Sequence, residues 1–524
     1  MTEPNATNSS PSTPNPQARA GGVTGGHKVL VANRGEIACR VLRGARELGL
    51  PTVAIYSEAD AGAVHVSLAD EAVCVGPAPS AESYLRIEKV IEAALQTGAT
   101  IIHPGYGFLS EKAEFRDACD AAGLRFAGPP GDAMRKMGVK TVARQTMMAA
   151  GVPVVPGTAE GVRSAEEARK VAAEIGYPVM LKAASGGGGK GMRLVERPED
   201  IADALAGAQR EAASSFADDT VYIEKFVVRP RHIEVQVLAD GHGNCIHVFD
   251  RECSVQRRNQ KVIEESPAPH LSEATRYKMG EVAVAAARAV HYSGAGTIEF
   301  LVDPDENFYF MEMNTRLQVE HPVTELVTGV DLVIEMLRVA VGEPLSIRQQ
   351  DVQQRGHAIE CRIYAEDPAQ NFLPSPGKLE VYRPAKGPGI RVDDGVVEGS
   401  EIPRFYDPMI AKLSVWAPTR ALAVSRMDNA LAETEIGGIR HNVAYLRWLL
   451  AAAEFVDGRY DTGIIARLGA YGQQRAADPV AAALATALAA RRARAGDRPD
   501  AAHAASADRS GWANEARRSA VFGR

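Results

Sequence analysis

Two glutamates and an asparagine in the segment 297–321 have the residue types and the spacing of a cation site. Apolar and polar residues alternate on both sides of a short polar loop at 304–307, which predicts a β-hairpin. In that register Glu299 faces Glu312, and Asn314 lies on the same face. Because facing like charges destabilise a strand pair, we expect a divalent ion between them. All-oxygen ligands suit Mg²⁺ or Mn²⁺, which typically bridge substrate phosphates, so the hairpin predicts a nucleotide enzyme.

The residues after Asn314 continue this pattern. Arg316, Gln318 and Glu320 follow at every second position, so an extended segment would carry an ordered series of charged and amide groups on one face. Isolated acidic residues on strands more often face solvent than bind an ion, and a solvated face is the alternative interpretation. The chemical order of this face favours a binding site.

A glycine-rich run between two predicted strands has the composition of a phosphate-binding loop. Its residues are Gly186, Gly187, Gly188, Gly189, Lys190 and Gly191. A strand rather than a helix follows at 192–195, which excludes a dinucleotide-binding turn, and the absence of Ser or Thr after Lys190 excludes a P-loop. The bare backbone N–H groups of such a run can close over phosphates. A flexible linker is the alternative, but Lys182 on the preceding strand favours phosphate binding.

Further polar residues are candidate nucleotide or anion contacts. They are Lys140, Glu224, Lys225, His232 and the cluster 256–261, which includes Gln256 and Lys261. Each of them alone is more often a surface residue than a ligand. Together with the hairpin they predict an anion site.

The composition is that of an ordinary globular protein with several domains. The chain has 524 residues, of which 45% are hydrophobic and 24% charged, and its formal net charge is −7. This balance gives no reason to expect nucleic acid or a membrane as a partner. No apolar run reaches the ~20 residues that cross a bilayer. The six cysteines form no CxxC pair, so we expect neither zinc nor disulfides, and a cytoplasmic location.

Alternating apolar strands and amphipathic helices open the chain. Strands are predicted at 28–32, 52–57, 72–75, 100–103 and 125–127, with helices at 36–48, 84–97 and 113–122 between them. This βα alternation predicts a parallel sheet covered by helices. The first turn lacks the triple-glycine motif, which argues against NAD or FAD on this sheet. The fold class is therefore α/β followed by α+β.

Changes of composition and rhythm suggest five regions. We expect a disordered tail at 1–26, a first domain at 27–137, a second at 138–348 with a mobile glycine-rich lid at about 154–226, and a third at 349–472. An alanine-rich helix and a disordered tail are predicted at 473–524, where the residues after the helix are low in bulky apolar side chains.

Six motifs together resemble the biotin carboxylase members of the ATP-grasp superfamily. They read YPVMLKAASGGGGKGM, PRHIEVQVLAD, QRRNQK, GTIEF, EMNTRLQVEHPVTE and GHAIECRIYAEDP. The resemblance covers about 27–470. It implies a Rossmann-like N-terminal domain, an ATP-grasp domain with the lid, and a C-terminal biotin carboxylase domain. It also implies that MgATP and bicarbonate carboxylate biotin at its ureido N1 through carboxyphosphate.

The resemblance assigns a role to each candidate residue. It implies metal binding by Glu299, Glu312 and Asn314, with two ions expected. It implies ATP binding by Lys140, Lys182, the loop 186–191, Glu224, Lys225, His232 and Gln256. The bicarbonate pocket would comprise Lys261, Arg316, Gln318, the backbone of Val319, and Glu320 as the base. Tyr106 and Arg362 would bind biotin. For Arg362 alone, a structural ion pair with Glu366 or Asp367 is the alternative.

One departure from some family members is Asn259, which replaces a histidine. Because of this amide, the resemblance does not indicate which acyl-CoA is preferred. The tripeptide Met-Lys-Met of a biotinyl domain does not occur in the sequence. We therefore expect biotin on a separate carrier protein, a carboxyltransferase partner, an acetyl-CoA or acyl-CoA carboxylase assembly, and a homodimer. The alternatives are another ATP-grasp ligase, such as a carboxylate–amine ligase or carbamoyl phosphate synthesis, and a non-catalytic subunit that retains the fold.

Overall fold

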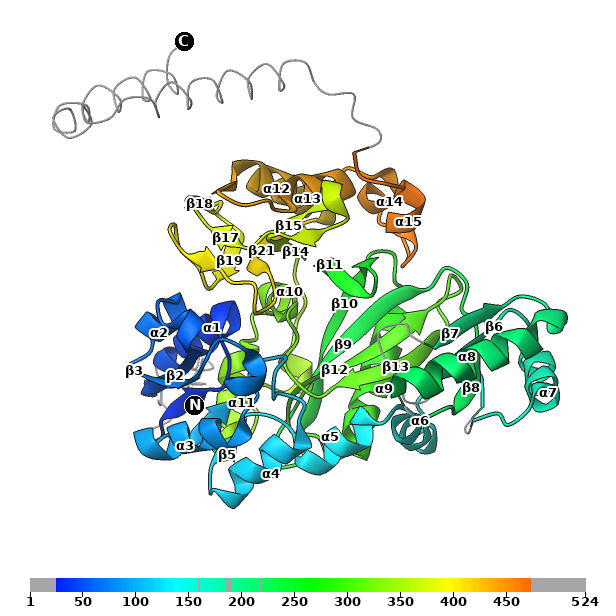
Figure 1. Cartoon of the computed structure of the whole chain (residues 1–524), viewed down its shortest axis with the longest axis horizontal. Coiled ribbons are helices and arrows are strands. Elements are labelled where there is room, and N and C mark those ends of the chain that lie inside the picture. The colour runs from blue at the N-terminus through cyan, green and yellow to red at the C-terminus, as the bar shows by residue number, and fades with distance from the viewer. Residues whose placement is uncertain (1–24, 159–160, 184–190, 217, 473–524) are drawn as a thin grey trace, which may run out of the picture. The chain divides into compact units, whose positions relative to one another are not determined.

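The structure is a computed structural model that describes residues 25–158, 161–183, 191–216 and 218–472 (Figure 1). Gly186, Gly187, Gly188, Gly189 and Lys190 lie outside the described residues, as do most of the tail expected at 1–26 and the whole region 473–524. All the elements named below belong to one unit that ends at Gly469.

A five-stranded parallel sheet forms the N-terminal part. Its elements are β1 (Val29–Val31), α1 (Gly35–Glu47), β2 (Thr52–Ser57), α2 (Val64–Leu68), β3 (Glu71–Gly76), α3 (Ile87–Thr97), β4 (Ile101–His103), α4 (Ala113–Ala121) and β5 (Arg125–Phe126). The strand order is β3-β2-β1-β4-β5. Val29 and Val31 pack with α1 on one face, and Leu30 packs with α3 and α4 on the other. Strands covered on both faces need continuous apolar residues, so the predicted parallel sheet is confirmed.

A smaller antiparallel sheet lies in the region expected to be a lid, at the right of Figure 1. Helices α5 (Gly131–Gly138) and α6 (Lys140–Ala149) precede this region, whose own elements are α7 (Ala165–Ile175), β6 (Val179–Ala183), β7 (Met192–Val195), α8 (Ile201–Phe216) and β8 (Val221–Lys225). The strand order is β7-β6-β8. Apolar residues of these strands and of α7 and α8 form a core cluster of their own. The glycine-rich run therefore connects two paired strands, as predicted.

The largest sheet has eight strands. It contains β9 (Arg231–Ala239), β10 (Cys245–Arg257), β11 (Gln260–Ser266), β12 (Gly294–Val302), β13 (Phe308–Asn314), β14 (His357–Tyr364), β19 (Ile390–Asp394) and β21 (Met409–Ala417). The order is β13-β12-β9-β10-β11-β14-β21-β19. Helix α9 (Glu273–Ala289) packs on β9 and β10. Because β11 pairs with β14, the sheet continues across the boundary expected between 348 and 349.

Further elements are one helix before the boundary at 348 and those of the C-terminal part. They are α11 (Leu332–Ala340), β15 (Glu366–Asp367), β16 (Leu373–Pro374), β17 (Gly377–Lys378), β18 (Val381–Arg383), β20 (Glu401–Ile402), α12 (Arg420–Glu433), β22 (Glu435–Gly437), α13 (Val443–Leu450), α14 (Ala453–Val456) and α15 (Ile464–Leu468). Helix α12 packs on β14 and β21. No helix in the described ranges is long and apolar enough to cross a membrane.

The predicted hairpin is confirmed, but its extension is wrong. Strands β12 and β13 pair antiparallel with Glu299 opposite Glu312. Strand β13 ends at Asn314, the backbone turns through 315–320, and α10 (His321–Thr328) begins. Pro322 lies in the first turn of α10, a position that proline favours, so the chain has left strand geometry before this point.

Candidate active site

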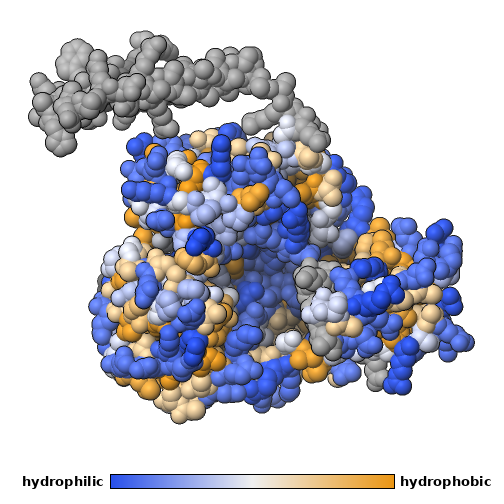
Figure 2. All heavy atoms as spheres, in the orientation of Figure 1, coloured by the Kyte–Doolittle hydropathy of each residue, from blue (hydrophilic) through white to orange (hydrophobic). Residues whose placement is uncertain are grey.

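A cavity of about 700 Å³ collects most of the predicted site residues. Its lining includes Lys140, Lys182, Glu224, His232, Gln256, Asn259, Lys261, Glu299, Glu312, Asn314, Arg316, Gln318, Val319 and Arg362. Figure 2 shows a hydrophilic hollow on this face of the molecule, where Figure 1 places β9 and β12. Another cavity, of about 530 Å³, is lined by residues of β10, α9 and 349–352 and contains none of the predicted residues.

Lys261 on β11 lies at the centre of the charged groups. Its Nζ donates hydrogen bonds to Glu234 Oε2 at 2.6 Å, Glu299 Oε1 at 2.8 Å and Glu320 Oε1 at 2.7 Å. Burial alone would lower the pKa of Lys261, but the three carboxylates raise it well above its usual value. The ammonium group is therefore charged and shared among three anions.

Glu320 is held between two cations. Besides Lys261, Arg362 Nη2 donates to Glu320 Oε2 at 2.9 Å. Burial of the carboxyl would raise its pKa, but Lys261, Arg362 and Arg251 together hold the pKa of Glu320 well below its usual value. The carboxylate is thus ionised and able to accept a proton.

Arg362 does not form the structural ion pair considered as its alternative role. Its Nε donates to Glu264 Oε1 at 2.7 Å, and its Nη2 donates to Glu320 Oε2 at 2.9 Å. Glu366 instead pairs with Arg257 at 3.0 Å. Burial raises the pKa of Glu264 to about 8, so this carboxyl is a weaker partner for Arg362 near neutral pH than Glu320 is. The guanidinium faces the cavity beside the proposed base.

The predicted cation ligands suit a divalent ion. Burial, followed by repulsion from Glu299, raises the pKa of Glu312. Asn314 Nδ2 donates to Glu299 Oε1 at 2.8 Å. Two facing carboxylates beside an amide offer oxygen ligands, and a divalent cation would relieve the crowding that raises the pKa of Glu312.

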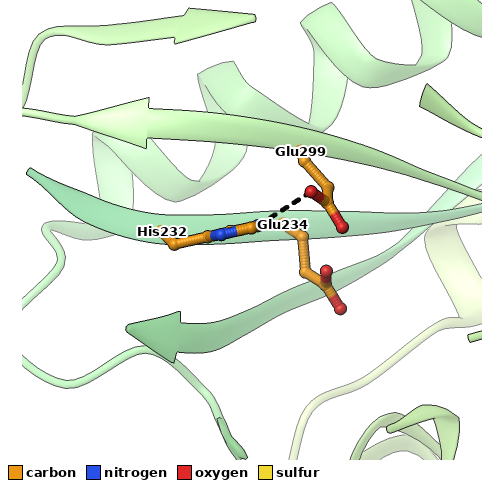
Figure 3. Close-up of side chains that lie close together, drawn as sticks. All are labelled: His232, Glu234 and Glu299. Atoms are coloured by element: carbon orange, nitrogen blue, oxygen red, sulfur yellow. Dashed lines mark ion pairs between the residues drawn. The ribbon is translucent and has the colours of Figure 1, made fainter. Parts of the chain in front are cut away.

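A further acidic group belongs to this cluster and was missed by the sequence analysis. Figure 3 shows Glu234 beside His232 on β9, with Glu299 on β12 opposite them. The ligand atoms of these three side chains lie within 4.8 Å of one another. Glu299 Oε2 is 3.0 Å from His232 Nε2, and this contact raises the pKa of His232 although burial alone would lower it. The alternation of His232, Glu234 and Gln236 on one strand face was the signal.

Arg316 and Gln318 reach the cavity from the turn that follows β13. Arg316 Nη1 donates to Gln318 Oε1 at 2.9 Å, and its Nη2 donates to Asn314 Oδ1 at 3.0 Å. Gln318 Nε2 donates to Glu299 Oε1 at 3.1 Å. Glu111, which the sequence analysis did not single out, accepts from Arg316 Nε at 3.0 Å. The structure therefore brings these residues together without strand alternation.

The predicted nucleotide contacts divide into two groups. Lys182 Nζ donates to Glu224 Oε2 at 2.5 Å, and Arg144 donates to the other oxygen at 3.1 Å. Gln256 Nε2 lies 2.7 Å from His232 Nδ1. These groups face the cavity, but the ammonium of Lys225 is bound by the carbonyls of Gly176 and Tyr177 at 2.8 and 3.0 Å.

Two further predicted residues have their contacts elsewhere. Gly191 has a φ of +72°, and an added Cβ there would lie 2.7 Å from the Cβ of Ala183, so the end of the glycine run needs glycine. Tyr106 donates its hydroxyl proton to Glu36, and its ring centroid is 5.9 Å from Lys412 Nζ. Neither residue lines the cavity in the part of the chain that is described.

Comparisons with known families match three consecutive parts of the chain. Residues 26–134 match the biotin carboxylase N-terminal domain, and 360–467 match the biotin carboxylase C-terminal domain. Between them, 140–348 match the ATP-binding domain of the carbamoyl-phosphate synthase L chain.

Relatives of known identity cover most of the chain. The biotin carboxylase of a Nostoc species is 52% identical over 438 residues, which are 84% of this chain and 98% of that protein. The propionyl-CoA carboxylase alpha chain of Ruegeria pomeroyi is 54% identical over 84% of this chain and 68% of its own length. The crystal structure of a Campylobacter jejuni biotin carboxylase complex with β,γ-ATP is similar with a TM-score of 0.80 at 49% identity, over 84% of this chain and 98% of that one. The chain therefore belongs to the biotin carboxylase family, whose members carry out the ATP-dependent carboxylation of biotin that begins acyl-CoA carboxylation.

Proposed function

We propose that this chain uses ATP and bicarbonate to carboxylate the ureido N1 of biotin, and that the cavity around Lys261 is where it does so. The observation that carries the proposal is the position of Glu320 between Lys261 and Arg362. A base for bicarbonate must be ionised and must lie among cations that also attract the anion. Glu320 meets both conditions.

Bicarbonate would be held and deprotonated by the groups around Glu320. Arg316 offers a planar, bidentate donor for a carboxylate-like anion, and Gln318 and the backbone of Val319 line the same cavity. The low pKa of Glu320 keeps it ionised but makes it a weak base. When bicarbonate shares Lys261 with the three carboxylates, the pKa of Glu320 rises, so proton transfer becomes easier once substrate is bound.

The nucleotide end would neutralise charge during phosphoryl transfer. A bicarbonate oxygen attacks the γ-phosphorus, the bond to the bridging oxygen breaks, and ADP and carboxyphosphate form. Lys140, Lys182 and His232 would bind ATP together with the loop 186–191, and Gln256 would orient His232. Glu224 and Lys225 would lie at the adenine. Glu299, Glu312 and Asn314 would hold the Mg²⁺ or Mn²⁺ ions, which supply charge neutralisation at the phosphates.

The biotin end would use Arg362 and Tyr106. Carboxyphosphate breaks down to CO₂ and phosphate, the phosphate takes the N1 proton, and N1 bonds to CO₂. Loss of the N1 proton, before the bond to CO₂ forms, places negative charge on the ureido oxygen, where the guanidinium of Arg362 would stabilise it. Because Arg362 is bound by Glu320 in the structure, movement of Glu320 toward bicarbonate would free a donor for biotin.

The relatives are subunits of multisubunit carboxylases as well as single biotin carboxylases. We propose that biotin reaches this cavity on a separate carrier protein, that a carboxyltransferase subunit uses the product, and that the chain forms a homodimer. The cytoplasmic location expected from the cysteines belongs to the same proposal, and all six cysteines are free thiols in the structure. Comparison of kcat/KM for a biotinylated carrier domain with that for free biotin tests the carrier.

The decisive experiment is ADP release with Mg²⁺ and bicarbonate, with and without free biotin, for the wild-type chain and Glu320→Gln. We expect biotin to stimulate ADP release, and the variant to lose at least a hundredfold of the stimulated rate, since the base is gone. Glu435→Gln is the matched control, because Glu435 is 60% exposed and pairs with an exposed arginine.

Each other outcome points to a different function. ADP release that is indifferent to biotin would indicate another ATP-grasp ligase. No ADP release under any condition would indicate a non-catalytic subunit. Stimulation that survives Glu320→Gln would keep the reaction but remove Glu320 as its base.

A further inference from the structure

A lysine outside the predicted site is buried directly behind it. Lys412 on β21 has no exposed side-chain surface, and its Nζ donates to the carbonyl oxygen of Val319 at 2.9 Å. In the register of β14 and β21, Lys412 lies opposite Arg362, so the two cations share a sheet face. Helix α10, which begins just after Val319, packs on both strands.

Carboxylates surround this ammonium group. Glu36 Oε2 lies 3.3 Å from Lys412 Nζ, and Asp393 Oδ2 lies 3.7 Å from it. Glu360, also buried, acts on it through space, and Arg391 is the nearby cation that opposes these acids. Burial would lower the pKa of Lys412, but the acids raise it, so the group is a charged donor.

A buried charge at this position is a costly way to gain stability. Apolar side chains of similar volume often stabilise a core as well as a buried ion pair does. Two cations on opposed strand positions also repel each other. What the ammonium offers, and an apolar side chain does not, is a strong hydrogen bond to one particular carbonyl.

That carbonyl belongs to the peptide that joins Val319 to Glu320. Fixing its plane fixes the ψ angle of Val319 and the φ angle of Glu320, and these set the direction in which the Glu320 side chain leaves the backbone. We infer that Lys412 is a positioning residue for bicarbonate: it holds the turn 318–320 so that Glu320 and the backbone of Val319 meet the anion. The inference rests on the proposed function of the cavity.

The same ammonium group also links the two expected substrate ends. Tyr106, expected at biotin, donates to Glu36, and Glu36 contacts Lys412. The contacts therefore run from Tyr106 through Glu36 and Lys412 to Val319. All the members of this series come from different elements: the segment after β4, helix α1, strand β21 and the turn before α10.

The test is steady-state kinetics of biotin-dependent ADP release by Lys412→Met in the full chain. We expect KM for bicarbonate to rise about ten- to a hundredfold, which is the loss of one charge-assisted hydrogen bond, while KM for ATP changes less than twofold. Partial unfolding would lower kcat by reducing the amount of active enzyme, but it would leave every KM where it was.

Two further variants separate positioning from stability. Lys412→Met with Glu36→Gln removes both charges of the close pair and keeps an acceptor for Tyr106, so thermal stability should recover while KM for bicarbonate stays high. Glu360→Gln removes a buried charge from the same sheet face, where the carboxylate accepts a hydrogen bond from Ser414 Oγ at 2.7 Å. The hydrogen bond from Lys412 to the carbonyl of Val319 remains in this variant. Its KM for bicarbonate should equal that of the wild type.

Two results would overturn the inference. The first is a KM for bicarbonate in Lys412→Met that lies within twofold of the wild-type value. The second is a double variant in which both the thermal stability and the KM for bicarbonate return to their wild-type values. Absence of biotin-stimulated ADP release by the wild type would instead refute the proposed function, so the two failures are distinguishable.

Discussion

At the scale of single residues, the charged side chains of the site bind one another when no substrate is present. Lys261 holds Glu234, Glu299 and Glu320, and Arg362 holds Glu320. Each of these contacts uses a group that bicarbonate, biotin or a cation would need. Binding of substrates therefore exchanges one set of buried ion pairs for another, which costs less than desolvating free charges.

Glu312 is an acid that this arrangement leaves poorly compensated. Burial and Glu299 raise the pKa of Glu312 in the folded state. The folded protein therefore loses stability as the pH rises from the unfolded pKa of this carboxyl to its folded pKa, and nothing is lost where Glu312 is protonated in both states. We expect Glu312→Gln to be about 1 kcal/mol more stable than the wild type at pH 7 without metal, and this advantage should disappear as the pH falls below ~4. Urea unfolding at several pH values measures it.

The same substitution should remove a response to the ligand. MgATP should raise the melting temperature of the wild type, because it binds the folded state only, and should raise that of Glu312→Gln much less. A variant that is less stable than the wild type without metal, or that responds equally to MgATP, would show that Glu312 is not the crowded metal ligand.

The site residues were predictable from sequence where pattern and motif agreed. The hairpin register placed Glu299 opposite Glu312 correctly because apolar alternation fixes a register. Glu234 and Lys412 were missed, since each lies on a strand of buried residues whose alternation resembles core packing. Their partners come from distant segments, and a single sequence does not show which strands become neighbours.

At the scale of elements, one buried carboxylate ties two C-terminal elements and the segment before α15 together. Glu265 on β11 accepts hydrogen bonds from Arg420 on α12 at 2.8 and 2.9 Å. His357 on β14 and the hydroxyl of Tyr460 bind the same carboxylate, each at 2.5 Å. These contacts outweigh burial and lower the pKa of Glu265 to about 2.

Glu265→Gln should therefore weaken this junction in a pH-dependent way. A depressed carboxyl pKa contributes stability that is present above the unfolded pKa of ~4.5 and is lost as the pH falls toward about 2. We expect the variant to lose about 3 kcal/mol at pH 7 and its deficit to shrink between pH 5 and pH 3. Chemical unfolding of both proteins across this range measures it. A deficit independent of pH would contradict the assignment to ionised Glu265.

The course of the chain between β13 and α10 shows what element-level patterns cannot predict. Arg316, Gln318 and Glu320 have strand spacing, yet they lie on a turn. Polar side chains at alternate positions can act at one cavity from a turn as readily as from a strand: Arg316 and Gln318 line it, and the buried Glu320 binds Lys261, which lines it too. The proline at the start of α10 was the available signal, and it was outweighed by the alternation.

At the scale of the whole described unit, one acidic side chain links the parallel sheet region to the large sheet. Glu325 on α10 binds Arg40 of α1 at 3.0 Å and Arg391 of β19 at 2.7 Å. Arg40 also binds Asp331 at 2.7 Å. Arg40 and Arg391 hold the pKa of Glu325 below its usual value although burial would raise it. Three segments that are far apart in sequence thus meet at one carboxylate.

Glu325→Gln should lower the free energy of unfolding by more than the loss of one ordinary hydrogen bond would. The amide keeps the shape of the side chain but removes the charge between two mostly buried arginines. Arg40 keeps Asp331 and Arg391 keeps Asp393 as partners, so we expect a loss of about 1.5–3 kcal/mol, that of charge-assisted hydrogen bonds. The free energy of unfolding from denaturant titration at pH 7 measures this loss. Asp428→Asn is the matched control: Asp428 also pairs with an arginine, but both side chains are more than two-fifths exposed, so less than about 1 kcal/mol should be lost.

Because Glu325 follows Glu320 by little more than one turn at the start of α10, loosening of this junction should also raise KM for bicarbonate. Equal losses in the two variants would mean that solvent already screens the buried junction and that it does not hold the two sheets together.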